Sequence, residues 1–148
     1  SPEEPGENGL TMIETFALID ELVKKPLQYL HVSLPDFYIN AYCGGDIEKP
    51  AIKQIHDRIN GKLPLIGVGN IYTADQINKA LNTGWSEFVA LGKTAIINPN
   101  IGSLILENRE NKIETELDLD RKDKYDLGEF LWNLANEGNQ LLPPLKKK

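Results

Sequence analysis

Two stretches, Pro64-Leu-Ile-Gly-Val-Gly-Asn70 and Phe88-Val-Ala-Leu-Gly-Lys93, decide which fold this chain of 148 residues is expected to adopt. Each is a short apolar run that ends in a glycine followed by a polar or basic residue. Runs of this kind, bounded by turn residues, are typical of buried strands in a parallel sheet. We therefore predict strands at 64–68 and 87–91, each followed by a turn that leads towards a helix.

Apolar residues at helical spacing predict helices on either side of these strands. Residues 11–25 and 73–84 each begin with the spacing of a capping box, Thr11 to Glu14 and Thr73 to Gln76. In the helix predicted for 50–60, Pro50 is expected at the first helical position and Asn60-Gly61 at the end. The expected buried positions of the three helices are Met12, Phe16, Ile19, Val23, Ile52, Ile55, Ile59, Ile77, Ala80 and Leu81.

A further strand is predicted at 28–33, where we expect both faces to be buried. After the strand at 87–91, a short helical segment is expected at 94–97 and a helix at 98–108, capped by Asn98 with Pro99 at its first position. Strands that alternate with helices form right-handed βαβ units and a parallel sheet. The fold class is therefore α/β.

The alternation of predicted strands and helices ends after residue 108. Residues 125–137 read as an amphipathic helix with an apolar face of Leu127, Phe130, Leu131 and Leu134. We accordingly divide the chain into residues 1–108 and a mostly helical C-terminal extension, 109–148. Trp132 is expected to pack against a further part of a barrel or a second subunit.

Composition excludes several function classes. A net charge of −6 and a pI near 4.9 argue against general nucleic-acid binding and against anionic membrane surfaces. The uncharged stretch 63–74 covers only twelve residues, whereas a membrane span needs roughly 20. One cysteine and two histidines leave too few ligands for a zinc site. We expect a cytoplasmic protein with no leader sequence at its acidic N-terminus.

The two strand-to-helix turns are the most specific functional signal. Glycine lets backbone amides approach an anion closely, and Lys93 adds a positive charge. Turns after consecutive parallel strands would face one phosphate between them, as the last two turns of a (βα)8 barrel do. The candidate site is Gly69, Asn70, Gly92 and Lys93. The plainer interpretation, that the glycines only allow tight connections, stays open, and a dinucleotide fingerprint fails because Tyr72 stands where its third glycine belongs.

Several of these motifs together resemble the C-terminal part of the old yellow enzyme family, the FMN-dependent NAD(P)H:flavin oxidoreductases and ene-reductases. The matching stretches run in order over about two thirds of the chain. They are Ser1-Pro-Glu-Glu with Glu7-Asn-Gly9, Tyr29-Leu-His-Val-Ser33, Pro64-Leu-Ile-Gly-Val-Gly-Asn-Ile71, Phe88-Val-Ala-Leu-Gly-Lys93 and Asn98-Pro99.

The resemblance implies that the three strands are about the sixth to eighth of a (βα)8 TIM barrel. It also implies that the amides of Gly69, Asn70, Gly92 and Lys93, together with the Lys93 side chain, hold the phosphate of FMN. The family usually has Arg at the position of Lys93, which forms a bidentate pair that Lys cannot form. Asn70 stands where a second glycine is usual, and Asn tolerates unusual backbone angles.

The resemblance further implies NADH or NADPH as electron donor, and a flavin and a small-molecule electron acceptor as partners. The family's catalytic residues lie in the first half of the barrel, and a whole barrel needs about 250 residues. The chain alone is therefore expected to be inactive. The alternatives are a non-catalytic half-barrel that binds phosphate or forms a homodimer through its open sheet edge, and part of another phosphate-binding barrel enzyme.

Other residues receive plainer interpretations. His31 is expected to be a partly buried, hydrogen-bonded histidine rather than a catalytic one, and Cys43 an unreactive thiol.

The loop 34–49 follows a strand on the face where barrel active sites lie, so Asp36, Tyr38 or Tyr42 could contact flavin or substrate in an intact enzyme.

Overall fold

The computed structural model describes residues 9–125 and 127–146, which form two compact units. The first unit contains residues up to Asn70 together with 77–90, and the second contains 71–76 and the chain from Leu91 onwards. The Ser1-Pro-Glu-Glu and Glu7-Asn8 motifs, and most of the loop predicted for residues 1–9, lie outside the described residues.

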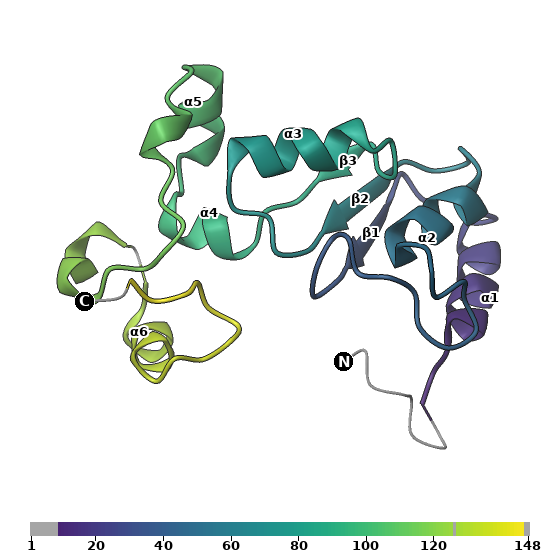
Figure 1. Cartoon of the computed structure of the whole chain (residues 1–148), viewed down its shortest axis with the longest axis horizontal. Coiled ribbons are helices and arrows are strands. Elements are labelled where there is room, and N and C mark those ends of the chain that lie inside the picture. Colours follow the sequence, from purple (N-terminus) through teal and green to yellow (C-terminus); the bar gives the residue numbers. More distant parts are fainter. Residues whose placement is uncertain (1–8, 126, 147–148) are drawn as a thin grey trace. The chain divides into compact units, whose positions relative to one another are not determined.

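The first unit is built on a parallel sheet of three strands in the order β1-β2-β3. These are β1 (Leu30–Ser33), β2 (Leu65–Val68) and β3 (Phe88–Val89), which run side by side in Figure 1. The predicted α/β alternation is confirmed, although β3 has two residues where five were expected. Its ladder continues for one further bond, because the amide of Ala90 donates to the carbonyl of Gly67 at 2.9 Å.

The two faces of this sheet differ in burial, so the prediction that residues 28–33 are buried on both faces is wrong. The alternation along β1 leaves His31 and Ser33 exposed, and the Phe88 side chain on the same face is 57% exposed. On the opposite face Leu65 and Gly67 are buried. One covered face is therefore enough to hold these strands in register within the unit.

Helix α2 (Ala51–Ile59) covers the buried face. Its predicted stripe of Ile52, Ile55 and Ile59 is confirmed as core, at no more than 3% exposure each. A Cβ added to Gly67 would lie 2.4 Å from Ile52 Cδ1, so the helix packs directly on the backbone of β2. Helix α1 (Met12–Leu22) contacts α2, and the Arg58 guanidinium forms two hydrogen bonds with the Asp20 carboxylate.

The helix boundaries follow local chemistry. Both predicted capping boxes are present: Thr11 and Glu14 open α1, and the Thr73 and Gln76 side chains bond each other's backbone amides at the start of α3 (Ala74–Asn82). Asn60 ends α2 with a left-handed φ of 51°. Pro50 is the residue before α2 rather than its first helical residue. Leu81, expected to be buried in α3, is 39% exposed.

The second unit consists of short helices. They are α4 (Lys93–Ile97), α5 (Ile101–Leu106), the 3-10 turns η1 (Glu110–Lys112) and η2 (Leu119–Lys124), and α6 (Glu129–Asn136). The helix predicted for 98–108 is shorter, and Asn98 does not cap it. The side chain of Asn98 instead bonds the backbone of Glu114, because a buried amide is better satisfied by a neighbouring chain segment than by solvent.

A hydrophobic core of its own holds the second unit together. It contains the buried residues Ile97, Leu117, Tyr125, Trp132, Ala135 and Leu142. Trp132 is 7% exposed and stacks on Tyr125 with ring centroids 6.3 Å apart, so it belongs to this core and not to a face awaiting another part of the molecule. The predicted apolar face of the last helix is confirmed for Leu127 and Leu134, which pack against this core, and is wrong for Phe130 and Leu131, which are 73% and 40% exposed. No helix in the described residues has the length and apolarity needed to cross a membrane.

Candidate functional site

The turn after β2 brings the chain close to the loop that follows β1. The carbonyl of Gly69 accepts a hydrogen bond of 3.0 Å from the amide of Phe37, and a Cβ on Gly69 would lie 2.4 Å from that same nitrogen. Packing within the chain therefore already requires glycine at residue 69. The next residue, Asn70, is exposed and left-handed with φ of 54°, which is the unusual backbone angle expected of it.

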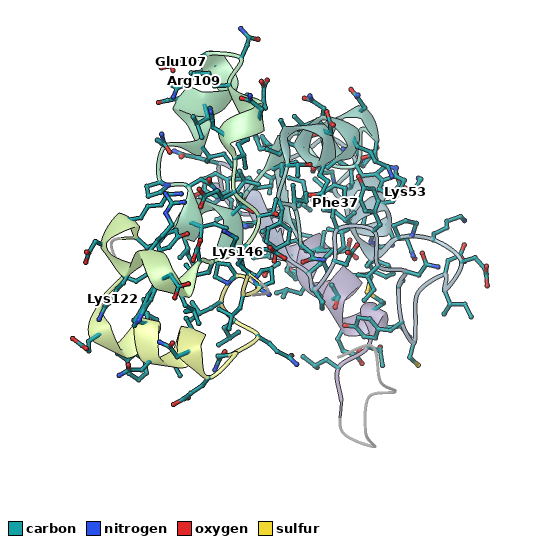
Figure 2. The ribbon with its side chains drawn as sticks, turned by 60° about the vertical axis from the view of Figure 1, so that its left-hand side comes forward. Phe37, Lys53, Glu107, Arg109, Lys122 and Lys146 are labelled. Carbon is teal, nitrogen blue, oxygen red and sulfur yellow. The ribbon has the colours of Figure 1, made fainter. Side chains whose placement is uncertain are left out.

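An aromatic cluster lies beneath this turn. Phe37, labelled in Figure 2, is fully buried and contacts the edge of Tyr38 at a centroid distance of 5.2 Å. Its ring lies nearly parallel to Trp85 at 6.4 Å, and the Lys79 ammonium lies 5.3 Å from the Tyr38 ring centre. The cluster fills the space between the loop after β1 and residues 77–90.

The second turn differs from the first because packing does not require its glycine. Gly92 precedes α4, and a Cβ added there would meet no atom within 4 Å. Lys93 is half-buried and forms no ion pair with another residue that the structure describes. The following Thr94 is fully buried, and its hydroxyl donates to the carbonyl of Ile71 at 2.8 Å, which fixes the start of α4.

Strands β2 and β3 end at the same edge of the sheet. Strands β2 and β3 are parallel neighbours, with Ile66 opposite Phe88 and Gly67 opposite Val89, so their carboxyl ends leave the same edge of the sheet. Gly69 and Asn70 belong to the first unit and Gly92 and Lys93 to the second. The structure thus defines each half of the predicted site within its own unit.

Among the other residues considered, only Tyr38 has a buried polar group without a partner in the described structure. Burial, followed by the Asp36 carboxylate, raises the pKa of Tyr38, and its hydroxyl makes no hydrogen bond. The Asp36 carboxylate accepts a bond of 2.8 Å from the amide of Tyr38, which shapes the loop. Tyr38 therefore packs within the first unit, and its contact with flavin or substrate stays a prediction.

Neither histidine lies in an arrangement of side chains typical of a catalytic or metal site among the residues that the structure describes. His31 is exposed, so the expectation that it is partly buried is wrong. His56 on α2 lies 3.1 Å from Glu87 Oε1, while Glu87 Oε2 accepts the Leu65 amide at 2.6 Å. Burial raises the pKa of Glu87, but these hydrogen bonds outweigh it and hold that pKa below its usual value. Cys43 is exposed, and the described residues contain no group of side chains that could hold a metal ion.

Sequence reasoning missed Phe37 and Trp85. Phe37 lies in a segment predicted only as a loop, where a single aromatic residue gives no periodic signal. The available signal was the spacing of Gly67 and Gly69, since alternate glycines on one strand mark close approach of another backbone or side chain.

Two known proteins are similar to this chain, and no protein-family model matches it. A protein of Bacillus subtilis (strain 168), named probable NADH-dependent flavin oxidoreductase YqiG, is 41% identical over 132 residues. The match covers 89% of this chain but only 35% of that relative. The NADH:acrylate oxidoreductase of Vibrio harveyi is 29% identical over 102 residues, which cover 67% of this chain and 10% of that protein.

The chain thus spans about a third of the length of the first relative and a tenth of the second. Both relatives are named for oxidation of NADH, and the first also for a flavin. These matches agree with the resemblance seen in the strand and turn motifs. The chain is therefore homologous to a part of each of these two proteins, which are named as a probable NADH-dependent flavin oxidoreductase and an NADH:acrylate oxidoreductase.

Proposed function

We propose that this chain is a segment of a cytoplasmic NADH-dependent flavin oxidoreductase and that it supplies the binding site for the phosphate of FMN. The observation that carries the proposal is Gly92, a glycine in a strand-to-helix turn for which packing within the chain gives no reason. Gly102 and Gly128 also meet no atom within 4 Å, but of these three glycines Gly92 alone follows a strand and precedes a lysine. Glycine in such a turn lets a ligand approach the backbone closely. Lys93, the next residue, brings a positive charge with no described partner.

The residues present fit a phosphate group. A left-handed residue such as Asn70 is one component of the concave turns in which successive backbone amides bind anions, which supports the proposal. Lys93 attracts a phosphate as a point charge, although it lacks the two-pronged geometry that Arg offers. Gly69 is required by Phe37 whether or not a ligand binds, so it supports the proposal only through the shape that it gives the turn.

FMN, when bound, would accept hydride from NADH and pass it to an oxidant such as an activated alkene. The acrylate named for the relative from Vibrio harveyi is an alkene of that class. In the proposed enzyme, FMN would supply the redox chemistry and the residues of this chain would hold and orient its phosphate. We assign them no catalytic role, and we propose that the chain by itself is inactive, with NADPH as the alternative electron donor.

The arrangement of the first unit supports a place within a (βα)8 barrel. Three parallel strands follow one another in sequence order, and α2 covers one face of their sheet. The other face carries the exposed residues His31, Ser33 and Phe88. In a closed barrel such a face points into the packed interior, where strands of the rest of the protein would cover it.

The exposed face also favours a second candidate function, a non-catalytic module that associates with itself. Strand β1 pairs only with β2 among the described strands, so one of its edges can accept another strand. Sedimentation equilibrium separates the two candidates. A defined dimer that melts cooperatively would support the module, whereas a monomer that binds FMN would support the enzyme segment.

The proposed site is tested by titrating the chain separately with FMN and with inorganic phosphate. Flavin fluorescence and the melting temperature are followed in the unaltered chain, in Lys93→Ala and in Lys112→Ala. Lys112 is an exposed lysine of η1 and serves as the matched control for a lost positive charge. We expect both ligands to raise the melting temperature of the unaltered chain and of Lys112→Ala, because a ligand that binds only the folded state stabilises it.

In Lys93→Ala the ligand-dependent rise should be lost or strongly reduced. A rise of equal size in both variants would contradict the role given to Lys93. No response from any of the three proteins would leave the glycine turns as tight connections and would refute a phosphate site in this chain.

A further inference from the structure

The loop after β1 and the turn after β2 are joined by two backbone hydrogen bonds. The amide of Leu34 donates to the carbonyl of Val68 at 2.9 Å, and the amide of Phe37 donates to the carbonyl of Gly69 at 3.0 Å. The second bond lies immediately before Asn70, the exposed left-handed residue of the candidate phosphate turn. A movement of Phe37 would therefore reach Asn70 through a single peptide unit.

Close packing reinforces this connection. A Cβ on Gly69 would lie 2.4 Å from the Phe37 nitrogen and 2.6 Å from the Asp36 carbonyl carbon, so backbone meets backbone at this point. Two residues earlier, a Cβ on Gly67 would lie 2.8 Å from Phe37 Cε2. The Phe37 ring thus rests on the end of β2 while its amide holds the turn.

The loop segment that carries Phe37 is itself fixed. The Asp36 carboxylate accepts the amide of Tyr38 at 2.8 Å, and the Asp36 carbonyl accepts the amide of Ile39 at 3.2 Å. The rings of Tyr38 and Trp85 enclose that of Phe37, which has no exposed surface. Figure 2 shows Phe37 in the interior of the first unit. Such a packed side chain has little freedom to adopt another rotamer.

We propose that Phe37 is a positioning residue for the phosphate turn. It holds the Gly69 carbonyl so that Asn70 stays left-handed and the turn is formed before a ligand arrives. The inference rests on the proposed function, because it assigns Phe37 to the same phosphate site. A preformed turn binds an anion without the cost of ordering its backbone.

Coupling between the loop and the turn must act in both directions. If Phe37 favours the conformation that binds phosphate, then phosphate bound at the turn must in return stabilise the bond between Phe37 and Gly69. Inorganic phosphate should therefore slow the hydrogen exchange of the Phe37 amide, which bonds the carbonyl of Gly69 directly before Asn70.

The test compares the unaltered chain with Phe37→Leu, Phe37→Met and Ile59→Val, using inorganic phosphate as the probe. Leu and Met keep an apolar side chain at residue 37 but remove the flat ring that lies against Gly67 and Trp85. Ile59 is a core residue of α2 at 1% exposure, so Ile59→Val is the control for a general loss of stability. Each protein is measured at a temperature at which it is fully folded.

Three readouts separate positioning from plain stability. They are the dissociation constant for phosphate, the exchange rate of the residue 37 amide, and the intraresidue amide-to-Hα nuclear Overhauser effect of Asn70, which is strong only when φ is positive. We expect Phe37→Leu to weaken phosphate binding about tenfold, which corresponds to ~1.4 kcal/mol. The same variant should speed the exchange and weaken the Overhauser effect. Ile59→Val should lower the melting temperature and change none of the three.

Two results would overturn the inference. In the first, both residue 37 variants keep the strong Overhauser effect of Asn70 and the phosphate affinity of the unaltered chain. In the second, Ile59→Val weakens phosphate binding as much as they do. If the unaltered chain binds neither phosphate nor FMN, the proposed function fails, and the Overhauser effect of Asn70 in the variants still decides whether Phe37 sets the conformation of the turn.

Discussion

Replacing Asn98 by Ala should strongly destabilise the second unit. Asn98 is 4% exposed, and its side chain makes three hydrogen bonds to the backbone. Its amide group donates to the carbonyls of Thr94 at 3.0 Å and Glu114 at 2.7 Å, and its carbonyl accepts the amide of Glu114 at 2.9 Å. The residue therefore joins the end of α4 to Glu114 in the C-terminal extension.

The expected cost follows from these three bonds. A hydrogen bond contributes a net ~1 kcal/mol to stability, and a buried group left without its partner loses more than that. Alanine would remove all three bonds and leave the Glu114 amide unpaired in a part-buried position. We therefore expect the free energy of unfolding to fall by about 3 kcal/mol.

The assay is urea unfolding at neutral pH, followed by the fluorescence of Trp132, which lies in the core of the same unit. The other tryptophan, Trp85, belongs to the first unit, and a Trp85→Phe background removes its signal so that the fluorescence reports the second unit alone. Asn111→Ala, a change at an exposed residue of η1, is the matched control and should cost little. A loss for Asn98→Ala below about 0.5 kcal/mol, or equal to that of Asn111→Ala, would refute the structural role given to Asn98.

Further expectations concern packing and pH. Gly67→Ala should destabilise the chain by about 1–3 kcal/mol in calorimetry, because its Cβ would collide with Ile52 Cδ1 at 2.4 Å. Gly102→Ala in helix α5 should instead stabilise it by up to ~1 kcal/mol, because the added Cβ meets no atom within 4 Å. Similar melting temperatures for the two variants would contradict this expectation. Trp132→Ala should cost about 3–5 kcal/mol in urea unfolding, and a cost near zero would show that Trp132 is not a core residue. Burial raises the pKa of Glu114, but the Lys124 ammonium outweighs it and holds that pKa below the usual value of 4.5. Glu114 therefore contributes stability above pH 4.5, and this contribution is lost as the pH falls through its lowered pKa. Glu114→Gln should be less stable than the unaltered chain at neutral pH, and the difference should shrink in acid. A difference in stability that does not change with pH would count against the ion pair.

The sequence was sufficient where a local pattern determines structure. The isoleucine spacing of α2, the Thr and Glu or Gln pairs that begin α1 and α3, and the end of α2 at Asn60-Gly61 depend on nearby residues only. Each of these was predicted from its own few residues.

The prediction was wrong where distant contacts decide. Asn98 followed by Pro99 has the pattern of a helix start, but a buried bond to Glu114 takes the side chain away from that role. The last helix buries Trp132 and Ala135 and exposes Phe130, because the partners of α6 select its buried face and the apolar pattern alone fits either choice. Nothing along residues 28–33 shows that one face of the sheet is uncovered.

For the candidate site, the sequence indicated only that Asn70 tolerates an unusual backbone angle, and the demand on Gly69 comes from Phe37, 32 positions away in the chain. A glycine kept for packing and a glycine kept for a ligand look the same in sequence. The structure gives a packing reason for Gly69, where a side chain would collide with backbone, and none for Gly92, where a Cβ would meet open space.

The central claim, that the turns after β2 and β3 bind one phosphate together, is tested most directly by following backbone amide resonances during a titration with inorganic phosphate. We predict that the amides of Asn70 and Lys93 shift along one saturable curve with a single dissociation constant, and that Lys93→Ala weakens the response of both. Shifts at only one turn, or two curves with different dissociation constants, would contradict a shared phosphate site.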